Sequence, residues 1–518
     1  MSNVLASDSS VDLVARKRVT TAILFGMFAA AIEMTIVSTA MPRVAGDLGG
    51  SDRYAWVLSS YLLASTISAP LFGKLADLIG RRPAYLSGMA LFLLGSWTSG
   101  AAWSMDALIV ARGLQGIGGG ALATVGLTII GDLYPPEERG KVQGLFSAVW
   151  GFAGALGPVA GGLIVDFLSW RWVFYLNLPF GLIAMILLAL SLREEIEKKP
   201  VSIDWLGALL LGGSVIALQL GAGAHGVAGL GRAPLLVSAV ALVLFYFVEK
   251  RAKEPIVPLG LFAQPTIVVS VAITLLLGMT MLAVTNYVPL FVQGAQGAST
   301  RESGLVMTPF AVAWPVAGFS VGMLLNRVGY RRSVVLGCAL IVTSAIALTF
   351  LRIDSSRGWV LVAMALLGLG MGLQNTPLLI ALQSAVPWSQ RGSATAMFSF
   401  SRTLGNTLGA VFAGAIAEHA LVGTAVTSAT IDQALRPGAP LAPLAVRQAL
   451  SGSVHAVLLI NVVVALAALA FATRVPKVVM RSTVPLPPAP TEHPATSPDA
   501  YSESPKPMTA PVSGSGPH

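Results

Sequence analysis

Long apolar runs separated by short polar breaks cover most of the chain. Most runs contain about 20 residues, the length of helix that crosses the hydrocarbon core of a bilayer. The runs predict fourteen membrane-spanning helices, near residues 19–41, 54–74, 83–103, 106–131, 143–168, 173–192, 204–224, 233–249, 265–292, 303–325, 333–351, 358–384, 394–417 and 452–474. The pattern therefore predicts an all-α membrane protein.

One polar break occurs twice along the chain. The break 73–82 joins the second and third runs, and a weaker copy at 322–331 begins 249 positions later. Glycines in the break let the ends of two helices approach, and its basic residues stay in water. Repeated groups of membrane helices are typical of transporters, in which two related halves move around a shared site. The copies differ in charge, because Asn326 stands where the first copy has Asp77.

The spacing of the two copies indicates two additional helices between the halves. Two halves of six helices would place the copies about 200 residues apart, and a surplus of about 50 residues is the length of two more helices. The predicted organisation is a cytoplasmic N-terminal segment 1–18, an N-terminal six-helix half 19–192, a linker with two additional transmembrane helices 193–250, a C-terminal six-helix half 251–475 with an extracellular loop 418–451, and a disordered Pro-rich cytoplasmic tail 476–518.

Composition supports a membrane protein and excludes several other classes. Hydrophobic residues make up 55% of the chain and charged residues 11%, whereas a soluble domain is about 25% charged. The net charge of +9 comes from short basic clusters at the ends of the runs, so it does not indicate nucleic acid. The sequence has no GxxxxGK[ST], HExxH or CxxC motif and a single cysteine. We therefore expect no enzyme, no metal site and no cofactor.

The distribution of Lys and Arg predicts the orientation of the chain. The side that holds the amino terminus carries 22 of the 33 basic residues, and the opposite side carries nine. By the positive-inside rule, both termini are predicted to be cytoplasmic in a multi-pass protein of the cell membrane. Arg112 and Arg402 remain inside predicted spans, where an unpaired charge is costly, so both need partners.

Five motifs in the expected order resemble those of the major facilitator superfamily, in its fourteen-span drug:proton antiporter-2 group of multidrug exporters. They are the loop 73–82 between spans 2 and 3, the span-4 motif 108–118, the span-5 antiporter motif 151–162, the span-1 motif 31–42 and the span 5–6 junction 169–179. The resemblance covers about residues 15–475. One departure concerns span 1, in which the group usually has Asp and this chain has Glu33.

Glu33 is the main candidate for proton coupling. It lies about fourteen positions into the first span, or roughly 21 Å along the helix, past the middle of the membrane. An ionised carboxylate is costly there, so the sequence predicts a group that takes up and releases a proton. In an antiporter, a cation and a proton compete for that carboxylate. The alternative is a structural Glu that is hydrogen-bonded to a serine or to the backbone.

Arg112 is the second candidate for proton coupling. Its planar guanidinium could bridge backbone carbonyls or a carboxylate from span 1, beside Gln115. The resemblance gives Arg112 the proton-relay role of the span-4 motif. A helix-pinning arginine is the structural alternative, and both roles can hold together.

The break after span 2 is predicted to act as a conformational switch at the cytoplasmic rim. By resemblance, it latches neighbouring helix ends while the protein is open to the outside. Asp77 is expected to face the amino end of a later helix, where negative charge is favoured. The switch residues are Gly73, Asp77, Gly80, Arg81 and Arg82.

Span 5 carries glycines at steps of three and four residues, which places them on one smooth face. Pro158 lies among them, removes a backbone donor and is expected to bend the helix. The resemblance implies a hinge and seal between the halves, formed by Gly154, Gly157, Pro158 and Gly161. Close helix packing without a functional role is the alternative.

Uncharged polar side chains inside the spans are candidates for a substrate cavity, namely Gln115, Asn286, Gln293, Gln374 and Asn375. Hydrogen bonds between helices are the alternative use of these amides. Spans 9 to 14 have no deep Asp or Glu, so a monovalent or lipophilic substrate fits better than a divalent cation.

The combined expectation is a proton-coupled efflux transporter that exports amphipathic or cationic compounds by alternating access. Its energy source would be the proton gradient, and its partners would be the small-molecule substrate, protons and membrane lipids, with no nucleic acid. A monomer suffices, because one chain contains both halves. The alternatives are an exporter of a lipid, glycolipid or endogenous metabolite on the same fold, and a receptor or accessory subunit that transports nothing.

Overall fold

A computed structural model describes residues 9–49, 53–192, 194, 204–222, 233–252, 255, 257, 259–298, 300–421 and 443–476. The described residues form helices and connecting turns with no strand, which confirms the predicted all-α class. Residues 1–8 of the predicted N-terminal segment, most of the linker and of the external loop, and nearly all of the C-terminal tail lie outside the described residues.

The first half contains seven helical segments. They are α1 (Ser9–Leu48), α2 (Tyr54–Ile79), α3 (Arg81–Gly100), α4 (Met105–Leu133), α5 (Pro136–Phe167), α6 (Arg171–Tyr175) and α7 (Asn177–Ser191). The predicted span 173–192 is therefore two helices that meet at Leu176, and α1 extends beyond the predicted span at both ends.

The remaining helices follow in the predicted order. They are α8 (Trp205–Ala222), α9 (Ala233–Arg251), the short 3-10 turn η2 (Leu259–Ala263), α10 (Pro265–Leu290), the π-helical turn η3 (Phe291–Ala295), α11 (Thr300–Leu305), α12 (Thr308–Val328), α13 (Tyr330–Thr349), α14 (Arg357–Ser384), the 3-10 turn η4 (Trp388–Gln390), α15 (Arg391–Leu421) and α17 (Leu444–Ala472). The helices α15 and α17 include residues 418–421 and 444–451 of the predicted external loop, and its residues 422–442 lie outside the described residues.

All fourteen predicted spans coincide with helical residues, but ten helical segments in the described part of the chain are long and apolar enough to cross a membrane. The count of fourteen spans is therefore not confirmed. The four remaining predicted spans correspond to α3, α5, α8 and α15. Polar residues explain part of this difference, because α3 and α5 begin with charged residues and α15 is rich in Ser, Thr and Gly.

The same pattern of helix packing occurs in both halves. In the first half α4 packs against α2 and α3, and α1 packs against α5 and α7. In the second half α14 packs against α12 and α13, and α10 packs against α15 and α17. The two halves are therefore structural repeats, as the recurring polar break indicated.

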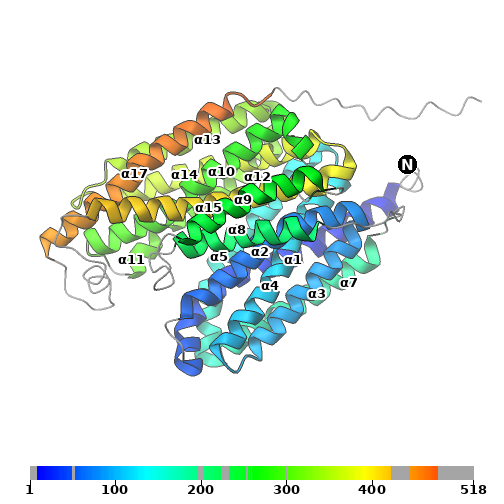
Figure 1. The fold of residues 1–518 in the computed structure, drawn as a ribbon, viewed down its shortest axis with the longest axis horizontal. Helices are drawn as coiled ribbons and strands as arrows, with labels where there is room; N and C mark the ends of the chain where they lie inside the picture. Colours follow the sequence, from blue (N-terminus) through cyan, green and yellow to red (C-terminus); the bar gives the residue numbers. More distant parts are fainter. Residues whose placement is uncertain are drawn as a thin grey trace, which may run out of the picture. The chain divides into compact units, whose positions relative to one another are not determined.

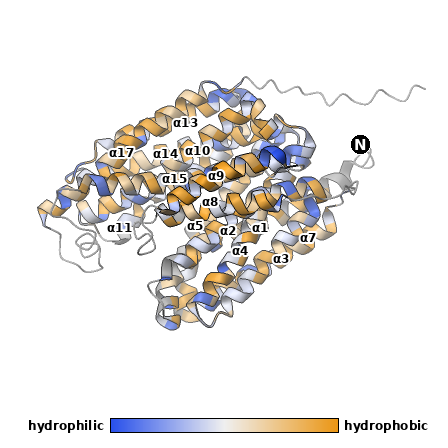
Figure 2. Cartoon of the chain, viewed as in Figure 1, coloured by the Kyte–Doolittle hydropathy of each residue, from blue (hydrophilic) through white to orange (hydrophobic). Residues whose placement is uncertain are grey.

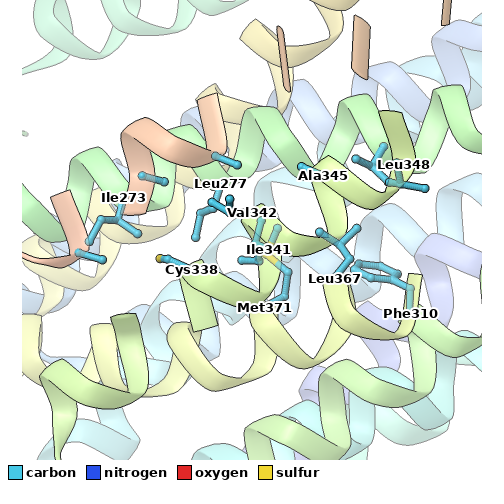
Figure 3. Packing of buried hydrophobic residues seen from close by; sticks show 14 of the residues in the cluster. Ile273, Leu277, Phe310, Cys338, Ile341, Val342, Ala345, Leu348, Leu367 and Met371 are labelled. Atoms are coloured by element: carbon cyan, nitrogen blue, oxygen red, sulfur yellow. The ribbon is translucent and has the colours of Figure 1, made fainter. Parts of the chain in front are cut away.

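Each half has its own apolar core. The core of the second half includes Ile273 and Leu277 of α10, Phe310 of α12 and Cys338 of α13, and these side chains lie together in Figure 3. All four are at most 8% exposed. Burial of this apolar surface stabilises the half.

The additional helices α8 and α9 pack side by side, and α8 contacts both α2 and α15 (Figure 1). Most of their residues are coloured as hydrophobic in Figure 2, and Leu236, Val240 and Phe247 of α9 are more than half exposed. These helices therefore cover a junction of the two halves and present an apolar surface suited to lipid.

Candidate functional site

Glu33 of α1 and Arg112 of α4 form a buried ion pair in the first half. The Arg112 Nη1 donates to Glu33 Oε1 and to Gln115 Oε1, the second at 2.6 Å. Glu33 is 0% exposed and Arg112 1%. The arginine thus contacts a carboxylate of the first helix and joins two helices.

Asn177 and Ser96 complete the hydrogen-bond network around Glu33. The amide of Asn177, the first residue of α7, donates to Glu33 Oε2 and to Ser96 Oγ, the second at 3.0 Å. Gln115 Nε2 also donates to Ser96 Oγ at 3.2 Å, and the Ser96 hydroxyl donates to the Phe174 carbonyl at 2.7 Å. Both carboxylate oxygens therefore have donors, which offsets the cost of burying the charge.

The ring of Tyr61 covers the guanidinium of Arg112. The distance from Arg112 Cζ to the ring centre is 4.4 Å, and Arg112 Nε donates to the Val57 carbonyl at 3.3 Å. Gly116 and Gly119 of α4 permit this approach, because a Cβ atom at either would collide with Tyr61. Tyr61 is 4% exposed, so the pair is enclosed. A proton reaches Glu33 only if the surrounding helices move or water enters.

Sequence reasoning missed the roles of Tyr61, Ser96 and Asn177. Asn177 was visible only within the motif 169–179, and Tyr61 and Ser96 lie in apolar runs without a local signal. The one usable indication was an Asn two residues before Pro179, at the start of an apolar run.

Asp77 of α2 binds the amino end of α15 across the junction of the halves. Its Oδ1 accepts the Gly392 N–H at 3.0 Å, and its Oδ2 accepts the N–H and the hydroxyl of Ser393, both at 2.8 Å. A carboxylate is favoured there by the helix dipole and by the unpaired N–H groups of the first turn. We refer to this end of the molecule as the Asp77 end.

Arg81 links Asp77 to two further groups at this end. Its guanidinium lies 3.0 Å from Asp77 Oδ1 and 3.0 Å from Asp132 Oδ2, and it donates to the Trp388 carbonyl at 2.8 Å. The Trp388 ring stacks on the guanidinium at 4.1 Å. Arg391 of α15 donates to Asp132 Oδ1 at 3.0 Å. The cluster therefore joins α2 and α4 of the first half to η4 and α15 of the second.

The other switch residues have different positions. Arg82 stays within the first half, because its side chain donates to the Ala189 carbonyl at 2.8 Å and its N–H to Glu194 at 3.0 Å. Gly80 has φ 102°, a conformation that favours glycine, and Gly329 in the second copy has φ 83°. At Gly73, a Cβ atom would collide with Gly392 and Ala396, so this glycine allows α2 to approach α15.

A second junction of the halves is formed by α5 and α12. Cβ atoms at Gly140, Gly144 or Gly151 would meet Gly322, Phe319 or Pro315 respectively. Of the predicted hinge residues, Gly157 lies against Thr35 of α1, and Gly154 has open space around it. The helix continues through Pro158 to Phe167.

The predicted cavity residues differ in burial and in their contacts. Gln115 belongs to the Glu33 network, Gln374 is buried beside Met371, and Asn286 is exposed. Asn375 and Gln293 are half-buried on α14 and η3. Among the residues that the structure describes, no group of three or more His, Cys, Asp or Glu side chains could hold a metal ion.

Comparisons with known proteins agree with this architecture. Residues 23–410 match the family described as Major Facilitator Superfamily. The chain is 38% identical over 405 residues to "Multidrug transporter protein MdtP" of Bacillus subtilis, covering 76% of this chain and 74% of that protein. It is 35% identical over 409 residues to "Multidrug resistance protein 3" of the same organism, covering 77% and 79%.

Two solved structures have the same fold. The proton:xylose symporter XylE matches with a TM-score of 0.61 at 16% identity, covering 90% of this chain and 97% of that one. The human organic anion transporter MFSD10 matches with a TM-score of 0.58 at 15% identity, covering 87% and 99%.

Proposed function

Because the chain belongs to the Major Facilitator Superfamily and is an efflux transporter rather than an enzyme, we propose that proton movement drives its export of amphipathic or cationic compounds. The enclosed Glu33–Arg112 pair is the observation that carries this proposal. The proposal assigns the chain to the fourteen-span drug:proton antiporter-2 group, with α3, α5, α8 and α15 as spans beside the ten apolar segments.

Glu33 carries the proton in this mechanism. Protonation removes its negative charge, so the ion pair with Arg112 is lost and the guanidinium keeps Gln115 and the Val57 carbonyl as partners. The buried Glu33–Arg112 pair is neutral overall while Glu33 is ionised. Protonation of Glu33 leaves a net positive charge at the pair, which disfavours a bound cation nearby. Proton and cationic substrate therefore bias the transporter in opposite directions.

The Asp77 cluster is proposed to be the latch of the outward-facing state. The polar contacts of Asp77, Arg81 and Arg391 join the halves at one end, where Gly73 allows α2 to pack closely against α15. The glycines of α5 allow the second junction, with α12, to close tightly. We assign this end to the cytoplasm, as the distribution of basic residues predicts. Opening the latch would expose the space between the halves to the cytoplasm.

Substrate binding needs no resident cofactor in this proposal, and the proton gradient supplies the energy. The protein is placed in the cell membrane as a monomer, with both termini in the cytoplasm. A lipid or endogenous metabolite is the alternative cargo on the same fold.

Ethidium efflux from energised cells tests the proposal. Wild-type efflux should collapse when a protonophore is added, and Glu33→Gln should fail at normal membrane levels. Glu302→Gln is the matched control, because Glu302 forms an exposed pair with Arg357 and should leave efflux unchanged. Ethidium accumulation that the wild type does not alter would refute the drug-export proposal and favour the lipid or metabolite cargo.

A further inference from the structure

Arg402 lies in the middle of α15. It is eleven residues after Arg391, or about 16 Å along the helix from the Asp77 end. None of the hydrogen bonds or ion pairs among the described residues involves its side chain, whereas the Arg112 side chain contacts Glu33, Gln115, the Val57 carbonyl and the Tyr61 ring. An unpaired guanidinium in a membrane-spanning helix is costly and typically marks a functional site.

Arg402 lies on a face of α15 that also carries Thr395, which is close to the junction of the halves. Thr395, Ser399, Arg402 and Asn406 recur at steps of four, three and four residues, which places them on one face of the helix. The Gln383 amide donates to Thr395 Oγ1 and to the Leu127 carbonyl of α4, each at 3.1 Å. This face therefore points towards the first half near the Asp77 end.

Two polar neighbours on the same face also lack partners. Ser399 Oγ and Asn406 Oδ1 are buried, and neither has a hydrogen-bond partner in the part of the chain that the structure describes. The backbone at Gly405 and Gly409 packs against Leu275 and Met279 of α10, which fixes this part of α15 in place. The Arg402 guanidinium, the Ser399 hydroxyl and the Asn406 amide oxygen thus lie on one face of α15, and each can still form hydrogen bonds.

We propose that Arg402, Ser399 and Asn406 form a subsite for the anionic group of a transported molecule. A carboxylate or phosphate matches the fork of the guanidinium, the Ser399 hydroxyl donates to the same group, and Asn406 Oδ1 accepts from a neighbouring N–H or O–H of the ligand. The subsite rests on the proposed export function and extends its substrates from cations to amphiphiles that carry a negative charge. Its depth near the midplane is the level at which transporters of repeated halves hold their substrates.

The test compares uptake of an anionic dye, fluorescein, with uptake of a cationic dye, ethidium, into inside-out membrane vesicles. The variants are Arg402→Gln and Arg402→Lys, and Arg357→Gln serves as a control because that arginine is exposed and pairs with Glu302. Loss of a charge-assisted contact predicts that Arg402→Gln lowers fluorescein uptake about tenfold more than ethidium uptake. Arg402→Lys should restore part of the difference, and Arg357→Gln should change neither dye.

Equal losses for both dyes in Arg402→Gln, or uptake of ethidium without fluorescein by the wild type, would overturn the subsite and leave the proposed export function standing. Uptake of fluorescein alone, lost in Arg402→Gln, would support the subsite and refute cation export. If neither dye is taken up, the subsite is tested by the thermal stabilisation that fluorescein gives to the purified proteins. Stabilisation of the wild type by fluorescein, absent in Arg402→Gln, supports the subsite, and equal stabilisation of both or of neither refutes it.

Discussion

Asp77 and Ser393 are 316 residues apart in sequence, and the Asp77 carboxylate accepts both the N–H and the hydroxyl of Ser393 at 2.8 Å. The contact joins the end of α2 in the first half to the first turn of α15 in the second. The Asp77 and Arg81 side chains are 4% and 3% exposed, so the latch excludes water. Loss of one partner of such a buried pair leaves the other charge unpaired, which is costly, so a single substitution should weaken the junction.

Removal of the Asp77 charge is expected to open the latch. In Asp77→Asn, the amino end of α15 loses its anion and Arg81 loses one carboxylate, which should weaken the junction by about 2 kcal/mol. Maleimide labelling of Ala396→Cys, combined with Cys338→Ser, would report the opening, because Ala396 is 1% exposed. We expect labelling about tenfold faster or more.

Asp106→Asn provides the control for this experiment, because Asp106 forms an exposed pair with Arg53 and lies away from the latch. An unchanged labelling rate in Asp77→Asn would show that the latch does not depend on the charge.

Gly73→Val is expected to force α2 away from α15. A Cβ atom there already collides with Ala396 and the Gly392 carbonyl, and overpacking of this kind costs about 1–3 kcal/mol. Efflux and thermal stability in detergent should both fall. Gly213→Val is the matched control, because Gly213 of α8 has open space around it, and equal losses in the two variants would argue against a specific contact.

Tyr61→Leu is expected to admit water and protons to the Glu33–Arg112 pair. The aromatic ring contributes about 1 kcal/mol of cation–π attraction and covers the guanidinium. Proteoliposomes with Tyr61→Leu should leak protons in the absence of ethidium, as measured with an internal pH dye. Tyr61→Phe keeps the ring and should remain tight, so a leak in both variants would assign the effect to the hydroxyl instead.

Asn177→Ala is expected to lower ethidium efflux about tenfold, because Glu33 Oε2 loses a donor in a buried site. Ser87→Ala removes a hydroxyl that bonds only to the Ala84 carbonyl of its own helix and should have little effect. Efflux by Asn177→Ala at the wild-type rate would indicate that Arg112 alone holds the carboxylate.

The sequence predicted the helices and the kind of group that Arg112 and Asp77 contact, because short stretches of sequence carry this information. Apolar runs of membrane length identified the fourteen helical regions, and a carboxylate of the first helix was already a possible partner for Arg112. The motif also suggested that Asp77 would meet the amino end of a later helix. Which helix Asp77 contacts depends on how the two halves pack against each other, and no short sequence pattern encodes that packing.

Other features depend on tertiary packing and were not predictable. Tyr61 and Ser96 are ordinary members of apolar runs, and only the three-dimensional approach of α2, α3 and α4 brings them to Arg112 and Gln115. The exposure of Asn286 and Gln374, two of the predicted cavity residues, also depends on packing, because neighbouring helices decide which face of each helix is covered. Asn286 is exposed and Gln374 is buried as a result.

Transport by Glu33→Gln in proteoliposomes tests the central claim most directly. Two quantities are measured in the same preparation: accumulation of ethidium driven by a pH gradient, and exchange of ethidium across the membrane without a gradient. Proton coupling through Glu33 predicts that the wild type performs both, and that Glu33→Gln retains exchange but loses accumulation. Accumulation by Glu33→Gln to the wild-type level would contradict the assignment of Glu33 as the coupling carboxylate.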